Sequence, residues 1–232
     1  MNSARRPTLY LTASLVFAAL VFTVFAHNFY LAWLFRTPMR SPLIVVHGVV
    51  MSGWVVLMGV QSGLIAARKP RWHRRLGIFG SVWAGLVVLL GCMTTLHASA
   101  REVRGHTEMM PLQLAITGFE LIQMALFLGF VASAVWLRNR SAYHKRLMLL
   151  TIACMLPSIF PRLPFNIFTS LTSILLGVYA SVALCIAFDT FRSRRIHPAF
   201  AWGGAVFFVA MQLAFFIVRT TWWQTWLRLA VA

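Results

Sequence analysis

Long apolar runs in this chain are separated by short basic segments. Along the chain, these segments are alternately rich and poor in arginine. A helix needs about 20 apolar residues to cross the hydrocarbon layer of a membrane. Seven runs reach or approach that length, at residues 9–35, 43–67, 76–97, 112–137, 147–160, 165–188 and 199–218. The sequence therefore predicts an all-α, polytopic membrane bundle of seven transmembrane helices. It forms a single domain over residues 1–232, with an interfacial tail at 220–232.

The distribution of basic residues predicts the orientation of this bundle. With the N-terminus in the cytoplasm, fourteen Lys and Arg residues fall on cytoplasmic segments and seven on the opposite face. An excess of Lys and Arg in short loops marks the cytoplasmic side of membrane proteins. We therefore expect a cytoplasmic N-terminus, a periplasmic C-terminus and a location in the bacterial inner membrane.

The same basic residues give the chain a formal net charge of +17. No soluble basic domain remains outside the apolar runs, so we expect no nucleic-acid partner. Cytoplasmic Lys and Arg residues instead favour anionic lipid headgroups, at about 1 kcal/mol each. The residues predicted to contact headgroups are His73, Arg74, Arg75, His144, Lys145 and Arg146. They form two similar His-basic-Arg-Leu blocks, which leaves open an internal repeat of helical hairpins.

Three histidines, His27, His47 and His97, lie within the first three runs, in the half predicted to face the periplasm. The second and third runs are expected to be antiparallel neighbours, so His47 and His97 can face each other. His47 shares one helical stripe with Trp54 and Gln61. Because polar atoms avoid lipid, this stripe is expected to face the interior of the bundle.

Glu120 is the one acid that we place deep within an apolar run. A charged residue at that depth costs roughly 3 kcal/mol by insertion scales unless it is neutralised or paired. Arg162 is the expected partner, because the short fifth run would leave it below the outer surface; a structural hydrogen bond between helices is the alternative. An outward-facing polar pocket is predicted, lined by Trp54, Gln61, Glu120, Gln123, Asn166 and Gln212.

A b-type haem is the cofactor that this pocket favours, because neutral imidazoles from two helices can ligate its iron. His47 with His97 is the preferred ligand pair and His27 with His97 the alternative, while Arg162 is expected to pair with a propionate. The predicted function is electron transfer, with quinol or a membrane protein complex as partner. The alternatives are a proton or small-ion transporter, a metal-handling protein, and a non-catalytic accessory or lipid-binding subunit. The sequence lacks nucleotide-binding and hydrolase motifs, so no catalytic residue is predicted.

Several blocks carry a resemblance. They are His47-Gly48, Trp54, Gln61, Arg68, His73-Arg74-Arg75-Leu76-Gly77, His144-Lys145-Arg146-Leu147-Met148, Arg162 and His197-Pro198. Through them, residues 28–215 resemble a group of uncharacterised bacterial multi-span inner-membrane proteins. The resemblance implies an inner-membrane location and no particular activity. A looser similarity, to cytochrome b561-like and ferric-reductase-like haem bundles, would apply to His47 and His97 only.

Overall fold

The structure is a computed structural model that describes residues 8–37, 41–105, 110–164 and 166–231. Within these residues the chain forms helices and no strand. The α-helices are α1 (Thr8–Val24), α2 (Pro42–Ala66), α3 (Pro70–Gly105), α4 (Met110–Trp136), α5 (Ser141–Ala153), α6 (Leu171–Ser193), α7 (Pro198–Ile217) and α8 (Thr221–Val231). A π-helical turn, Ala26–Tyr30, follows α1, and two 3-10 turns, Leu156–Ser158 and Phe160–Arg162, follow α5. The predicted all-helical class is confirmed.

Local residue chemistry sets several helix ends. Pro42 and Pro198 open α2 and α7, where the missing N–H costs nothing because first-turn donors have no intrahelical acceptor. Ser170 caps α6 by accepting a hydrogen bond from the Ser173 backbone N–H at 3.1 Å. Arg68 and Arg194, at the ends of α2 and α6, adopt positive φ angles of 58° and 60°. This left-handed conformation stops a helix and reverses the chain.

Within the described ranges, five helices, α2, α3, α4, α6 and α7, are long and apolar enough to cross a membrane. The other two predicted spans are shorter in the part of the chain that the structure describes. Helix α1 has 17 residues before the π-helical turn, and α5 has 13, or about 20 Å at 1.5 Å per residue. Beyond α5 the chain becomes irregular, because Pro157, Pro161 and Pro164 lack the N–H that a continuing helix needs.

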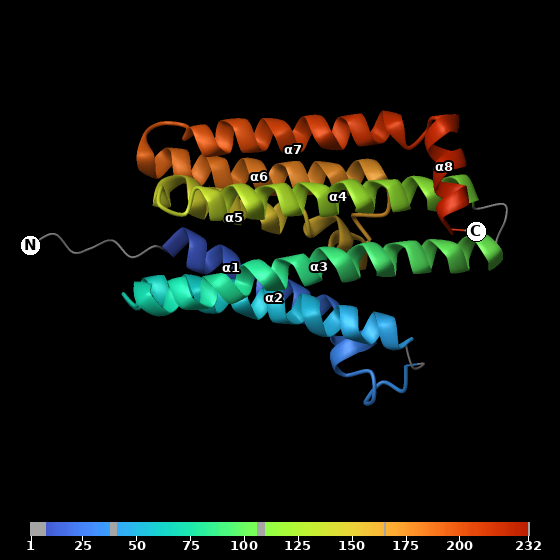
Figure 1. Cartoon of the computed structure of the whole chain (residues 1–232), viewed down its shortest axis with the longest axis horizontal. Coiled ribbons are helices and arrows are strands. Elements are labelled where there is room, and N and C mark those ends of the chain that lie inside the picture. The colour runs from blue at the N-terminus through green and yellow to red at the C-terminus, as the bar shows by residue number, and fades with distance from the viewer. Residues whose placement is uncertain (1–7, 38–40, 106–109, 165, 232) are drawn as a thin grey trace, which may run out of the picture.

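The long helices lie side by side as a bundle (Figure 1). Helix α4 packs against α3, α5 and α7, while α1 packs against α2 and α5. Large apolar side chains fill the centre, and the indole of Trp54 meets the ring of Phe127 edge-on at 5.1 Å. The outward faces of α6 and α7 are strongly apolar, with Leu184 and Trp202 70% and 76% exposed. Such a surface is suited to lipid rather than to water.

Helix α8 lies across the ends of α3 and α4 instead of along the bundle (Figure 1). Leu227 is buried against Leu114, whereas Trp222 and Leu229 on the opposite face of α8 are exposed. The predicted tail therefore folds as an amphipathic helix, with an apolar contact to the bundle.

Candidate functional site

The connections α2–α3, α4–α5 and α6–α7 gather at one end of the bundle, which we call the basic end (Figure 1). Eleven Lys and Arg side chains of the described chain are exposed there. They are Arg68, Lys69, Arg71, Arg74, Arg75, Arg138, Arg140, Lys145, Arg192, Arg194 and Arg195. Arg74, Arg75 and Lys145 are thus accessible, as their predicted role requires.

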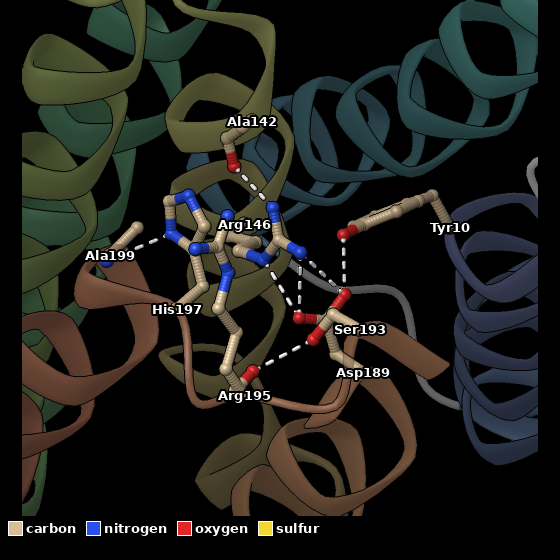
Figure 2. Close-up of polar contacts among 8 residues, drawn as sticks. All are labelled: Tyr10, Ala142, Arg146, Asp189, Ser193, Arg195, His197 and Ala199. Atoms are coloured by element: carbon tan, nitrogen blue, oxygen red, sulfur yellow. Dashed lines mark hydrogen bonds and ion pairs between the residues drawn. The ribbon is translucent and has the colours of Figure 1, made fainter. Parts of the chain in front are cut away.

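Arg146 differs from the headgroup contact predicted for it, because its side chain is buried in an ion pair with Asp189 of α6 (Figure 2). The Arg146 and Asp189 side chains are only 7% and 8% exposed. Arg146 Nε donates to Asp189 Oδ2 at 2.8 Å and Nη2 donates to Oδ1 at 2.9 Å. Arg146 Nη1 donates to the Ala142 carbonyl at 2.8 Å. A planar guanidinium and a carboxylate match in this two-pronged geometry.

Tyr10 ties α1 to the same ion pair (Figure 2). Its hydroxyl donates to Asp189 Oδ1 at 3.2 Å, and the Lys145 ammonium lies 5.0 Å from the centre of the Tyr10 ring. One turn further along α1, the Ser14 and Ser62 hydroxyls lie 3.0 Å apart, within hydrogen-bond distance. Asp189 therefore joins α1, α5 and α6 at the basic end.

His197 closes this cluster on the side of α7. Its Nδ1 accepts a hydrogen bond from the Ala199 backbone N–H at 3.1 Å, and its ring meets Tyr143 edge-on at 4.7 Å. Desolvation, and next the nearby charge of Arg146, lower the pKa of His197 below its usual value. The ring is therefore neutral at pH 7, as a capping acceptor must be.

A second polar group at the basic end joins the two His-basic-Arg-Leu blocks. The rings of His73 on α3 and His144 on α5 meet nearly at right angles, with centroids 6.0 Å apart. His144 Nδ1 lies 2.8 Å from the Ala134 carbonyl of α4. With its amide oriented to satisfy both ends, Gln61 donates to His73 Nδ1 at 2.6 Å and accepts from the Gly77 N–H at 2.9 Å. Gln61 thus belongs to the basic end and not to the outer half of the bundle.

The three histidines predicted to share a pocket are not brought together. His27 and His97 are exposed, and His27 Nδ1 lies 2.9 Å from the Asn28 side-chain oxygen. His47 is half-buried, with its ring against the Leu90 backbone and its Nδ1 without a partner in the described part of the chain. His97 is seven residues beyond Leu90, which is about 10 Å along the helix. His97 thus lies about 10 Å along α3 from the backbone that His47 contacts, and the pair His47–His97 stays a prediction as axial ligands of haem iron.

Glu120 makes a direct contact other than the predicted one. Its Oε2 accepts a hydrogen bond from Thr95 Oγ1 of α3 at 2.9 Å, which joins two helices as a structural hydrogen bond does. The positive charge of Arg162 is also near enough to attract the carboxylate of Glu120. Arg162 itself is exposed, donates to the Ser158 carbonyl and lies over the Phe25 ring at 5.3 Å.

The remaining residues of the predicted pocket are also dispersed. Trp54 and Gln123 are buried in the core, 2% and 4% exposed. Asn166 is exposed in the irregular segment before α6, and Gln212 is exposed on α7, where it accepts from the Tyr179 hydroxyl at 3.4 Å. The structure therefore brings polar residues together at the basic end, and not in one pocket in the opposite half.

Sequence reasoning missed Asp189 and Tyr10, the two residues that make Arg146 part of a buried network. Asp189 lies one residue beyond the end of the predicted sixth span, so hydropathy gives no reason to place it inside the bundle. The sequence did contain one signal. Asp189 is the single acidic residue at or next to the predicted cytoplasmic segments, which together carry fourteen Lys and Arg residues.

No family model, curated protein or solved structure matches this chain in the three comparisons made. The site must therefore be interpreted from its own geometry.

Proposed function

We propose that the chain is a non-catalytic protein of the bacterial inner membrane whose basic end lies in the cytoplasm and binds anionic phospholipid headgroups. One observation carries this proposal. Eleven exposed cations surround the basic end, while Asp189, the acid there, is buried and already neutralised by Arg146. No carboxylate at that end competes with lipid phosphate for the exposed cations among the described residues.

Exposed tryptophans support two membrane interfaces. At the basic end, Trp72 and Trp136 are 60% and 81% exposed, and Arg75 lies 5.6 Å from the centre of the Trp72 ring. At the other end, Trp222 and Trp226 of α8 are 68% and 50% exposed. Tryptophan favours the headgroup level, where its ring is half in hydrocarbon and half in water.

Seven passes between the two ends form part of the proposal. Helix α1 runs away from the basic end before α2 returns to it (Figure 1). Later in the chain, the segment from α5 to the start of α6 again leads away from the basic end. The short α5 needs the irregular segment after it to complete a pass. Non-helical backbone at such depth is tolerated where protein surrounds it, and Ile159 and Phe160 are indeed buried.

Cysteine labelling tests the orientation. Asn139 at the basic end and Thr225 on α8 are both exposed. With a membrane-impermeant thiol reagent, Thr225→Cys should react in cells whose outer membrane is permeabilised, and Asn139→Cys only after the inner membrane is opened. The reverse pattern would contradict the orientation.

Lipid binding is tested on purified protein by native mass spectrometry in mixed phosphatidylglycerol and phosphatidylcholine. Replacing Arg74 and Arg75 together by alanine should reduce the bound phosphatidylglycerol. The matched control removes the same charge at the other end, with Arg101 and Arg228 replaced by alanine, and should have less effect. Equal effects, or no preference for the anionic lipid, would contradict the proposal.

Haem binding stays a prediction, and His47 is the residue that supports it. Its ring is half-buried and its Nδ1 has no partner in the described part of the chain. An absorption spectrum of protein from a haem-replete host tests it: a Soret band that His47→Ala removes would favour haem at this position.

A further inference from the structure

Two imidazoles, His73 on α3 and His144 on α5, form a pair at the basic end. Their ring centroids are 6.0 Å apart and the rings are nearly perpendicular. Both side chains are only partly buried, so a phosphate group that contacts the basic end can reach them. A headgroup site made of arginines and lysines alone would not need this pair. What the pair adds depends on which ring nitrogens carry protons.

The side-chain amide of Gln61 determines the tautomer of His73. Its oxygen accepts from the Gly77 backbone N–H at 2.9 Å, and its nitrogen donates to the His73 carbonyl at 3.2 Å. An N–H only donates and a carbonyl only accepts, so this orientation of the amide satisfies both groups. The same amide nitrogen lies 2.6 Å from His73 Nδ1, which is therefore the acceptor. His73 is neutral in this arrangement, with its proton on Nε2.

His144 has the opposite tautomer. Its Nδ1 lies 2.8 Å from the Ala134 carbonyl of α4, and a carbonyl only accepts, so Nδ1 carries a proton. In the neutral ring, Nε2 is then an unprotonated acceptor. None of the hydrogen bonds that the two rings make in the described part of the chain uses Nε2. The pair thus offers a ligand one donor, His73 Nε2–H, and one acceptor, His144 Nε2.

Cations surround this donor and this acceptor. Arg74 follows His73 in the chain, and its charge is near enough to act on the imidazole. Arg140 lies one helical turn before His144, and both arginines are exposed. Asp189, the acid at this end among the described residues, is already neutralised in its buried ion pair. The charge around the pair therefore favours an anion as its ligand.

We propose that His73 and His144 select a phosphomonoester, the group found in phosphatidic acid and in free phosphate, over a phosphodiester. The second ionisation of a phosphomonoester occurs at about pH 6, so near neutral pH its last proton is easily shared with an imidazole. That proton lies between a phosphate oxygen and His144 Nε2, whichever of the two holds it. His73 Nε2–H donates to a second oxygen of the same group.

A phosphodiester such as phosphatidylglycerol has no proton on its phosphate oxygens. Beside it, the neutral His144 Nε2 meets only oxygen lone pairs, so one of the two hydrogen bonds is lost. This inference rests on the proposed function, since it names the phosphate chemistry that the basic end prefers. Charge alone would also favour phosphatidic acid, because a phosphomonoester carries up to two negative charges. The experiment must therefore separate the shared proton from the charge.

Inorganic phosphate and sulfate make that separation. Sulfate has the shape and the double charge of phosphate but no O–H near neutral pH, so it is the matched control ligand. Binding of each anion is measured by calorimetry at pH 7, with full-length protein in phosphatidylcholine nanodiscs. We expect phosphate to bind about 10-fold more tightly than sulfate, the effect of one hydrogen bond to a charged group. Charge alone predicts equal binding.

The lipid arm compares phosphatidic acid with phosphatidylglycerol by native mass spectrometry of the same protein. Wild type should prefer phosphatidic acid, and His144→Asn should reduce that preference about 10-fold. Because neutral His144 carries no charge, a preference that arises from charge alone would not change. Selection of phosphate over sulfate without selection between the two lipids would support the pair and identify its ligand as free phosphate.

Asparagine is the informative replacement at both histidines. It places a hydrogen-bonding group near the position of Nδ1 and lacks Nε2, so the contacts with Gln61 and with Ala134 are kept. His73→Asn and His144→Asn should each lose the selectivity for phosphate over sulfate and melt within a few degrees of wild type. His197→Asn removes Nε2 from another imidazole at the same end and keeps the helix-capping acceptor. It is the matched control and should retain the selectivity.

Three results would overturn the proposal: equal binding of phosphate and sulfate by wild type, unchanged selectivity in both asparagine variants, or an equal loss in His197→Asn. Failure of this inference and failure of the proposed function are distinguishable. Loss of phosphatidylglycerol when Arg74 and Arg75 are replaced, with no selectivity for phosphomonoesters in wild type, would keep the proposed function and reject the pair. Selectivity for phosphate over sulfate without binding of either anionic lipid would keep the pair and reject lipid binding.

Discussion

The buried ion pair between Arg146 and Asp189 gives the most quantitative prediction. Removing one partner leaves the other charged, buried and unpaired, which in protein interiors costs about 3–5 kcal/mol. Because both side chains are less than a tenth exposed, little of this is relieved by water. We expect Asp189→Ala and Arg146→Met each to destabilise the protein by about that amount.

The double variant Arg146→Met with Asp189→Leu should behave differently. It removes both charges and both desolvation costs, and apolar replacements of buried ion pairs are often neutral or stabilising. Its stability should therefore fall within about 1–2 kcal/mol of wild type, far above the sum of the single losses. The remaining cost includes the hydroxyl of Tyr10, which loses its acceptor on Asp189.

The assay is thermal unfolding in detergent or nanodiscs, followed by circular dichroism. For a chain of this length, 1 kcal/mol corresponds to roughly 2–4 °C, so each single variant should melt about 6–20 °C lower. Arg71→Met and Glu102→Gln, which neutralise exposed charges, are the matched controls and should melt within a few degrees of wild type. Additive losses in the double variant, or small losses in both single variants, would refute the reasoning.

Three further predictions concern the rest of the bundle. A Cβ at Gly118 would lie 2.6 Å from the Trp223 Nε1 of α8, so Gly118→Ala should destabilise the protein by about 1–3 kcal/mol in the same melting assay. Gly129→Ala on the same helix is the control: its Cβ meets open space, so it should be neutral or stabilising. Glu120→Gln should melt near wild type because an amide oxygen still accepts from Thr95, while Glu120→Ala should lose about 1–3 kcal/mol by leaving that hydroxyl unpaired. If haem binds at His47, the Soret band should disappear in His47→Ala and persist in His97→Ala, since His97 is exposed; loss in both would restore the paired-ligand hypothesis.

Hydropathy predicted which segments are helical but not where the helices end. The run 43–67 corresponds closely to α2 (Pro42–Ala66), because a proline and a left-handed arginine bound both the apolar run and the helix. The run 76–97 corresponds to the longer α3 (Pro70–Gly105), whose polar first and last turns are helical too. Hydropathy measures where a helix can meet lipid, whereas hydrogen bonding and backbone conformation set its ends.

The fifth run shows the opposite error. It is apolar to residue 160, yet α5 ends at Ala153. Burial explains the difference: residues 151–156 are all buried, so their apolar character reflects packing inside the bundle and not contact with lipid. A run of this kind cannot be distinguished from a membrane span by hydropathy alone, and its prolines are the stronger signal.

Placement of the polar groups depended on pairings that spacing along the chain does not contain. Arg146 and Asp189 are 43 residues apart, and only the packing of α5 against α6 brings them together. Spacing also does not contain relative depth: His97 lies about 10 Å along α3 from the Leu90 backbone that the His47 ring contacts. Periodicity identifies a face, whereas a site also requires a common depth.

The neutralised ion pair makes the stability of the bundle and its affinity for lipid separable. Arg146 contributes to packing and, being paired, adds almost no charge to the surface, whereas Arg74 and Arg75 are exposed and add charge without packing. Arg146→Met should therefore lower the melting temperature while leaving phosphatidylglycerol binding unchanged at a temperature where the variant is folded. Replacing Arg74 and Arg75 should have the converse effect. A loss of lipid binding in folded Arg146→Met would show that the buried cation reaches the headgroups, against its observed burial.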